Sequence, residues 1–273
     1  MKYIRIAVIV LLACSLGIYG AGVVRERANR DPSMPVITSD RQVLEISTAY
    51  QEEDLLAGLT AYDEEDGDLT DQILVGELSQ FVEKGLANLS YVVFDSANQP
   101  ASFSRQVRFT DYRSPILTLT EPLVFSRGET ENTASRIGAQ DVLDGDISSL
   151  VTETDSTVDY QTPGAYTVSV EVSNSFGDVE AQTLPVHVTE AGSRELDIQL
   201  TEPLVYLTPG EAFDPYAYLA GLLDASGETL DASLVEAESG VDPAAAGCYE
   251  VHYYADDGEG RNGETWLTVI VRA

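Results

Sequence analysis

The sequence is short of cysteine, histidine and positive charge, and each shortage excludes a class of protein. Its 273 residues include only two cysteines and two histidines. Cys14 lies in an apolar N-terminal segment, far from Cys248, so we expect no intramolecular disulfide, and packing alone must stabilise the fold. The sequence also lacks a Gly-rich phosphate loop, a His/Cys metal pattern and a Gly-x-Ser-x-Gly elbow. These absences predict a protein that is not an enzyme.

Negative charge dominates the polar residues that are present. The chain has 46 Asp and Glu against 15 Lys and Arg, a formal net charge of -31. A surface this acidic repels the phosphate backbone of nucleic acids, so nucleic acid is excluded as a partner. The same charge keeps an exposed protein soluble, and it leaves cations as candidate ligands.

One long apolar run predicts a membrane-spanning helix. Residues 6–24 contain no charged side chain, and Lys2, Arg5 and Arg25 flank them. At about 1.5 Å per residue such a helix spans roughly 28 Å, close to the hydrocarbon thickness of a bilayer. We therefore expect a single-pass protein of the cell membrane with the rest of the chain outside the cell. Two alternatives stay open: residues 11–14 resemble the lipobox of a lipoprotein acylated on Cys14, and a cleavable signal would release a secreted protein.

A repeat of about 80 residues organises the rest of the chain. Its first marker is the acidic turn Asp66-Gly67-Asp68, which returns as Asp144-Gly145-Asp146 and, more weakly, as Ser226-Gly227-Glu228. Its second marker is a Gly-x-Tyr entry into a strand, at residues 164–166 and again at residues 247–249. Similarity at a fixed spacing indicates tandem copies of one module.

Within each repeat the apolar pattern is that of β-strands. Tyr166, Val168, Val170 and Val172 alternate with polar residues, as in a strand with one buried face. About seven short strands in each repeat predict a sandwich. The expected fold is all-β, with three tandem immunoglobulin-like β-sandwiches after an N-terminal transmembrane or signal helix. The expected parts are an anchor or signal segment with its linker and three repeats: residues 1–30, 35–110, 111–190 and 191–273.

These motifs resemble the bacterial surface immunoglobulin-like repeat family, whose modules occur in Gram-positive surface proteins and at the end of some pesticidal crystal proteins. The resemblance rests on the two Asp-Gly-Asp turns and on the Pro-Gly-x-Tyr entry at residues 163–166. It implies a non-catalytic cell-surface protein that displays its modules for adhesion or for recognition of an extracellular glycan or protein. The alternatives are a passive spacer or envelope-assembly component, and a surface module stabilised by calcium.

The acidic turns are the candidate calcium sites. Carboxylate oxygens are the ligands that Ca²⁺ prefers, although the spacing is not that of an EF-hand. A turn that is merely acidic and solvated is the alternative. The candidate ligands are Asp63, Glu65, Asp66 and Asp68 in the first repeat and Asp144 and Asp146 in the second.

The third repeat supplies a candidate ligand-binding surface. Strand alternation turns His252 and Tyr254 outward, together with Trp266, the only tryptophan of the chain. Exposed aromatic rings on a rigid sheet suit sugar rings or protein partners. The alternative is that a loop covers Trp266 or that a bulge turns it inward.

Overall fold

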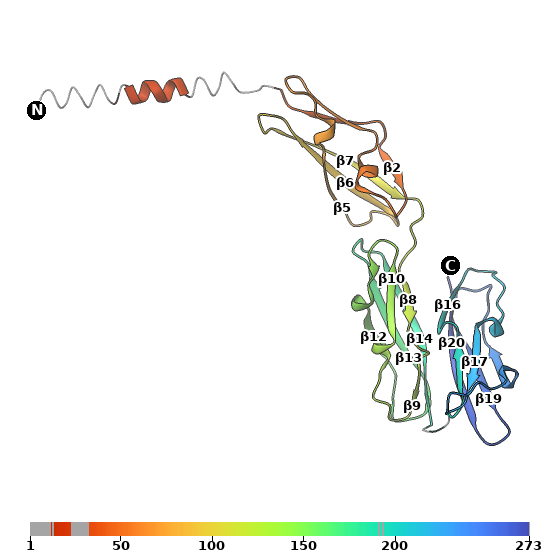
Figure 1. The fold of residues 1–273 in the computed structure, drawn as a ribbon. Coiled ribbons are helices and arrows are strands. Elements are labelled where there is room, and N and C mark those ends of the chain that lie inside the picture. Colours follow the sequence, from red (N-terminus) through yellow and green to blue (C-terminus); the bar gives the residue numbers. More distant parts are fainter. Residues whose placement is uncertain (1–11, 13, 23–32, 191, 193, 273) are drawn as a thin grey trace, which may run out of the picture. The chain divides into compact units, whose positions relative to one another are not determined.

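The computed structural model describes residue 12 and residues 14–22, 33–190, 192 and 194–272, and strands predominate in it. Contacts divide the chain into two compact units, Met1–Asp111 and Tyr112–Ala273 (Figure 1). The expected second and third repeats therefore lie together in one unit. The all-β class predicted from the strand pattern is confirmed.

The first unit contains two sheets, with strand orders β1-β3-β4 and β2-β7-β6-β5. Strand β2 pairs with β7 in parallel, whereas the other pairings are antiparallel. We call this pair of sheets the first sandwich. Its elements are β1 (Val36–Ser39), β2 (Val43–Ile46), β3 (Leu59–Asp63), β4 (Gly67–Asp68), β5 (Leu74–Leu78), β6 (Leu86–Phe94) and β7 (Pro100–Phe109), with the 3-10 helices η1 (Glu52–Leu56) and η2 (Thr70–Gln72).

The second unit contains two further pairs of sheets. The second sandwich has the sheets β11-β10-β8 and β12-β13-β14-β9, and the third has β15-β17 and β16-β20-β19-β18. The second sandwich consists of β8 (Ile116–Leu119), β9 (Val124–Ser126), β10 (Ile137–Asp141), β11 (Gly145–Asp146), β12 (Thr152–Ser156), β13 (Gly164–Ser173) and β14 (Val179–Thr189), with η3 (Thr133–Ser135) and η4 (Ser148–Leu150). The third consists of β15 (Asp197–Leu200), β16 (Leu204–Leu207), β17 (Leu219–Leu223), β18 (Val235–Ser239), β19 (Gly247–Asp256) and β20 (Asn262–Val271), with η5 (Pro215–Tyr218) and η6 (Ala232–Leu234).

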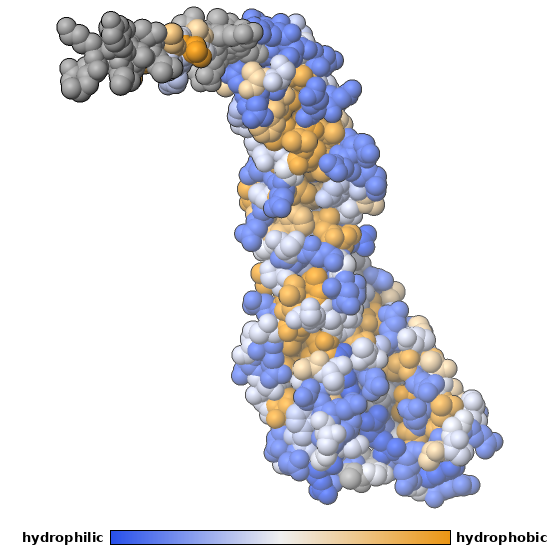
Figure 2. All heavy atoms as spheres, turned by 60° about the vertical axis from the view of Figure 1, so that its left-hand side comes forward, coloured by the Kyte–Doolittle hydropathy of each residue, from blue (hydrophilic) through white to orange (hydrophobic). Residues whose placement is uncertain are grey.

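Alternating apolar residues build the cores of the sandwiches. In β13, Val168, Val170 and Val172 are buried, and in β20 Leu267 and Val269 are fully buried. Burying an aliphatic side chain contributes about 1.5–3 kcal/mol, so the strand pattern supplies the main stabilising term. Hydrophilic residues occupy much of the surface visible in Figure 2, in keeping with the high net charge.

Residues 6–11, 13, 23 and 24 of the N-terminal apolar run lie outside the described residues. Leu12 and residues 14–22 are helical and exposed. In the part of the chain that the structure describes, no helix combines the length and the apolar character needed to cross a membrane. This finding contradicts the expected single-pass protein of the cell membrane, and that localisation is withdrawn.

Each acidic turn has a left-handed backbone conformation at its glycine. Gly67 and Gly145 have φ angles of 79° and 73°, in the left-handed region that side chains disfavour. Each turn leads into a two-residue strand, β4 or β11, that pairs with the end of the preceding strand. In the third sandwich Ser226 and Glu228 flank Gly227, and an isolated bridge between Leu223 and Thr229 takes the place of that short strand.

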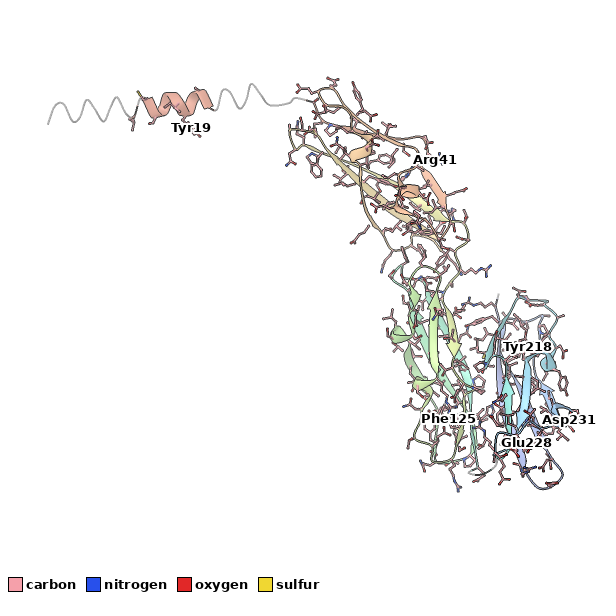
Figure 3. The ribbon with its side chains drawn as sticks, viewed as in Figure 1. Tyr19, Arg41, Phe125, Tyr218, Glu228 and Asp231 are labelled. Carbon is pink, nitrogen blue, oxygen red and sulfur yellow. The ribbon has the colours of Figure 1, made fainter. Side chains whose placement is uncertain are left out.

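A buried arginine anchors the second sandwich. The guanidinium of Arg136 donates to the carbonyls of Pro122 and Val124 at 2.8 and 2.9 Å, and it pairs with Glu131 at 2.9 Å. It also lies 4.3 Å from the ring centroid of Phe125, a fully buried side chain labelled in Figure 3. The Pro122 carbonyl also accepts from the backbone N–H of Val124 at 2.8 Å, and the Val124 carbonyl also accepts from Arg194 at 3.3 Å, so Arg136 adds a charged donor to each.

The second and third sandwiches pack side by side through faces that alternation turns outward. Ile270 in β20 and Leu204 in β16 are 1% and 8% exposed, and both belong to the apolar cluster of the second sandwich. Arg272 forms an ion pair of 2.8 Å with Glu180 of β14 at this contact. The two sandwiches therefore share part of one core.

Candidate functional site

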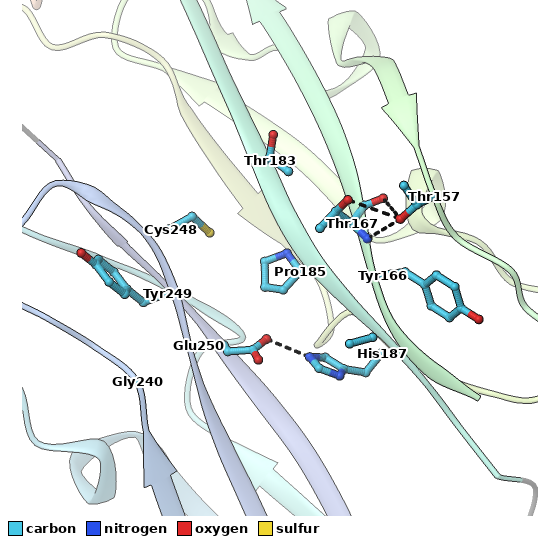
Figure 4. A pocket seen from close by; sticks show the side chains of 11 residues that line it. Thr157, Tyr166, Thr167, Thr183, Pro185, His187, Gly240, Cys248, Tyr249 and Glu250 are labelled. Atoms are coloured by element: carbon cyan, nitrogen blue, oxygen red, sulfur yellow. Dashed lines mark hydrogen bonds and ion pairs between the residues drawn. The ribbon is translucent and has the colours of Figure 1, made fainter. Parts of the chain in front are cut away.

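The contact between the second and third sandwiches leaves an open groove of about 520 Å³, lined by residues of β13, β14 and β19 (Figure 4). This volume is within the roughly 300–1,000 Å³ of small-molecule sites. The groove combines aromatic rings, hydroxyls and one carboxylate. Its lining residues include Tyr166, Thr183, Pro185, His187, Tyr249 and Glu250.

Two tyrosines stand on either side of the groove at equivalent places in the two sandwiches. The hydroxyl of Tyr166 donates to the carbonyl of Thr162 at 2.7 Å, and that of Tyr249 donates to the carbonyl of Ala245 at 3.0 Å. A Cβ at Gly247 would lie 3.3 Å from the Tyr249 ring, a tight contact, whereas a Cβ at Gly164 would lie 3.6 Å from the Tyr166 ring, an ordinary one. Since each hydroxyl is held, the half-buried rings are rigid apolar surfaces.

A column of stacked rings begins at His187, which lines the groove. His187 Nε2 lies 2.8 Å from a carboxylate oxygen of Glu250, and the His187 ring stacks on Trp266 at 4.0 Å between centroids. The ring of His252 covers the other face of Trp266 at 4.3 Å. Glu250, which lines the groove, is thus linked to the single tryptophan through one histidine.

The structure brings together the three residues expected to form an aromatic platform, but it does not leave them open. Both faces of the Trp266 indole are stacked on imidazoles, one of which comes from the second sandwich. Tyr254 donates its hydroxyl to Glu236, and this hydrogen bond raises the pKa of Tyr254. Ligand binding by Trp266, Tyr254 and His252 stays a prediction, and it now requires His187 to leave the indole face.

The carboxylates of the acidic turns accept hydrogen bonds from backbone N–H groups, some of them in a neighbouring turn. Asp66 accepts from the backbone N–H of Ser96 at 2.6 Å, and Asp144 accepts equivalently from Ser175 at 2.6 Å. The side chain of Thr70 lowers the pKa of Asp68, and such bonds stabilise the ionised turn.

Other carboxylates of the turns either bind a neighbouring residue or are exposed to solvent. Asp146 binds Ser148 through both the backbone and the hydroxyl, and Glu65 is exposed. Among the described residues, no group of three or more His, Cys, Asp and Glu side chains is placed to hold a metal ion. Calcium at the proposed ligands Asp63, Glu65, Asp66, Asp68, Asp144 and Asp146 stays a prediction.

The cysteine that lines the groove is not placed for nucleophilic chemistry. Burial, reinforced by the nearby charge of Glu250, raises the pKa of the Cys248 thiol to about 12. A thiolate is the reactive form of cysteine, so Cys248 is inert at neutral pH.

The sequence did not indicate the groove, because its residues come from two repeats and meet only through the lateral packing. One signal was available. Tyr166 and Tyr249 were visible as the repeated Gly-x-Tyr motif, although that motif suggested a strand entry and no ligand.

No protein-family model matches the chain. The chain is 30% identical over 223 residues to the pesticidal crystal protein Cry22Aa of Bacillus thuringiensis, covering 78% of this chain and 29% of that protein. It is 23% identical over 246 residues to an uncharacterized 81.3 kDa protein of Acholeplasma phage L2, covering 85% of this chain and 32% of that one. The chain thus spans about a third or less of the curated relatives it matches.

Solved structures resemble the chain only distantly. Clostridium perfringens ZmpB, in a structure of CBM51-2 in complex with GlcNAc and INT domains, matches 54% of this chain and 26% of its own at 20% identity, with a TM-score of 0.23. The extracellular domain of protocadherin GammaB4 matches 89% of this chain and 50% of its own at 12% identity, with a TM-score of 0.21. TM-scores this low carry no functional argument.

Proposed function

We propose that this protein is a non-catalytic recognition protein built of three immunoglobulin-like modules, and that it binds a glycan in the groove between the second and third. The observation that carries the proposal is the composition of the groove. Rigid tyrosine rings offer apolar surface to a sugar ring, while Thr183 and Glu250 offer groups that hydrogen-bond to sugar hydroxyls.

The charge of the protein restricts the class of glycan. The chain carries a net charge of -31, and Glu250 lies in the groove itself. Sulfated and uronic-acid sugars would be repelled, so the ligand we propose is a neutral or amino sugar. The similarity to part of a pesticidal crystal protein supports a module that larger proteins can also carry.

The single tryptophan reports on this site. Trp266 touches His187, which in turn contacts Glu250, so a sugar that engages Glu250 changes the surroundings of the indole. The experiment screens the full chain on a glycan array and then titrates each hit while Trp266 fluorescence is recorded. We expect saturable binding with a change in intensity or emission maximum.

Two variants locate the binding site. Tyr249→Ala removes a lining ring and should weaken binding, and Glu250→Gln should change sugar preference while keeping the side-chain shape. Tyr254→Ala is the control, because Tyr254 lies on the same strand but does not line the groove. Equal losses from Tyr249→Ala and Tyr254→Ala would contradict the groove. No response to any neutral or amino sugar would favour a passive spacer.

A further inference from the structure

Two positions recur in all three sandwiches, and each holds an acidic or amide side chain in every copy. The first position ends β3 and β10 and directly follows β17, and it holds Asp63, Asp141 and Asp224 in turn. The second position begins the turn before the last long strand, and the backbone N–H of its residue donates to the carbonyl four residues later in all three copies. That position holds Asp95, Asn174 and Asp257.

One oxygen at each position has the same task in every copy. At the first position, Oδ1 accepts from two backbone N–H groups of the following turn; for Asp63 these belong to Glu65 and Asp66, at 2.8 and 3.1 Å. At the second position, Oδ1 accepts from the residue four places later, as Asp95 does from the N–H of Gln99 at 2.7 Å. The other terminal atom of each side chain, Oδ2 of an aspartate or Nδ2 of the asparagine, therefore has a different partner in each sandwich.

The second and third sandwiches neutralise this pair in two different ways. In the second, the amide Nδ2 of Asn174 donates to Asp141 Oδ2 at 3.1 Å. In the third, Arg261 donates through Nε to Asp257 Oδ2, and its Nη1 lies 3.5 Å from Asp224 Oδ2. In both copies an N–H donor faces the free carboxylate oxygen.

The first sandwich has two carboxylates at these positions and no such donor among the described residues. Asp63 and Asp95 are 1% and 7% exposed, and the Oδ2 atoms of both are buried without a hydrogen-bond partner. A buried carboxylate oxygen without a donor or cation is strongly unfavourable. Gln99 stands where the third sandwich has Arg261, and its amide donates to the carbonyl of Ser33.

The hydrogen bonds of this pair leave one oxygen of each carboxylate unused. Asp63 Oδ1 accepts from the N–H groups of Glu65 and Asp66 and from the Ser33 hydroxyl, and Asp95 Oδ1 accepts from the N–H of Gln99. The two Oδ2 atoms are buried without a hydrogen-bond partner, so a cation would supply the positive charge that this place lacks.

We infer that the paired Oδ2 atoms of Asp63 and Asp95 form a cation site of the first sandwich, and that the cation is Ca²⁺. Both ligands are hard oxygens, and Ca²⁺ tolerates irregular coordination that Mg²⁺ does not. Only two carboxylate groups take part, so carbonyls or water complete the shell. We expect a dissociation constant of about 10⁻⁴ to 10⁻³ M, the range of extracellular calcium modules. This ligand pair differs from the turn carboxylates predicted from the sequence, because Asp95 lies 32 residues after Asp63.

The test titrates CaCl₂ into the full chain, after metal removal, by isothermal calorimetry, and follows thermal unfolding by circular dichroism. In the unaltered chain we expect one weak calcium site and a higher melting temperature in CaCl₂ than in NaCl of equal ionic strength. MgCl₂ should substitute poorly. Absence of calcium binding, or an equal effect of NaCl or MgCl₂, would overturn the inference.

Three variants test whether calcium binds at Asp63 and Asp95 or at exposed carboxylates in general. Asp95→Asn copies the second sandwich and should weaken calcium binding by about 10-fold or more, while melting without calcium no lower than the unaltered chain. Gln99→Arg copies Arg261 and should act in the same direction. Glu64→Gln removes one exposed carboxylate from the same turn and should leave calcium binding unchanged. Loss of binding in Glu64→Gln as large as in Asp95→Asn, or unchanged binding in Asp95→Asn, would refute the site.

Discussion

Replacing Ile270 with alanine tests the lateral packing that creates the groove. Alternation places Ile270 on the outer face of the third sandwich, yet it is 1% exposed because it packs into the core of the second. Truncating a buried isoleucine costs about 2–5 kcal/mol, whereas a change on a free surface stays within about 0.5 kcal/mol. We therefore expect Ile270→Ala to lower the free energy of unfolding of the second unit by about 2–5 kcal/mol.

Urea unfolding followed by Trp266 fluorescence measures this loss, because the indole stacks on His187 across the same contact. Loosening of the contact should also shift the native emission of Trp266. Val179→Ala is the matched control, since Val179 lies on β14 and is 49% exposed. If Ile270→Ala costs no more than Val179→Ala, the two sandwiches do not pack in solution and the groove does not exist there.

Three further predictions concern single side chains of the second unit. Arg136→Met removes a charged donor from the carbonyls of Pro122 and Val124, which should cost about 1.5–3 kcal/mol; a loss under about 1 kcal/mol in urea unfolding would contradict this role. Gly145→Ala should lower the free energy of unfolding by about 1–2 kcal/mol, because φ at Gly145 is 73° and alanine is strained there. A steric clash does not contribute, since an added Cβ meets nothing within 4 Å. Gly221 is equally open and has no positive φ, so Gly221→Ala should be near neutral in the same assay. The hydrogen bond from the Ser148 side chain lowers the pKa of Asp146 in the folded protein. The ionised Asp146 therefore contributes its full stabilisation of the fold above the unfolded-state pKa of about 3.9, and this contribution is lost as the pH falls through the folded-state pKa. Acid unfolding of Asp146→Asn should accordingly show a weaker dependence on pH below about 4 than the unaltered chain.

The strands were predictable because their signals are local. The alternation of Val168, Val170 and Val172 reflects a period of two that the backbone imposes, and a buried face follows from it. The Asp-Gly-Asp turns were equally readable, since a glycine in the left-handed region has few substitutes. Even the weaker third copy was visible, and there the structure has a single bridge in place of the short strand.

The N-terminal prediction shows the limit of hydropathy. An uncharged run of suitable length favours a membrane span, but length and composition are necessary conditions only. In the described residues no helix meets them.

By itself, the sequence determined the period of the repeat, the strands, the turns and the acidity, because each depends on neighbours along the chain. Tertiary structure alone decided which outward residues are covered, so that Ile270 is buried and Trp266 stacks between two histidines. It also decided which carboxylates are buried: Asp63 and Asp95 are 1% and 7% exposed, whereas Glu65 stays exposed in the turn that follows Asp63. Contacts between distant strands depend on how faces pack, and one-dimensional spacing does not encode that choice.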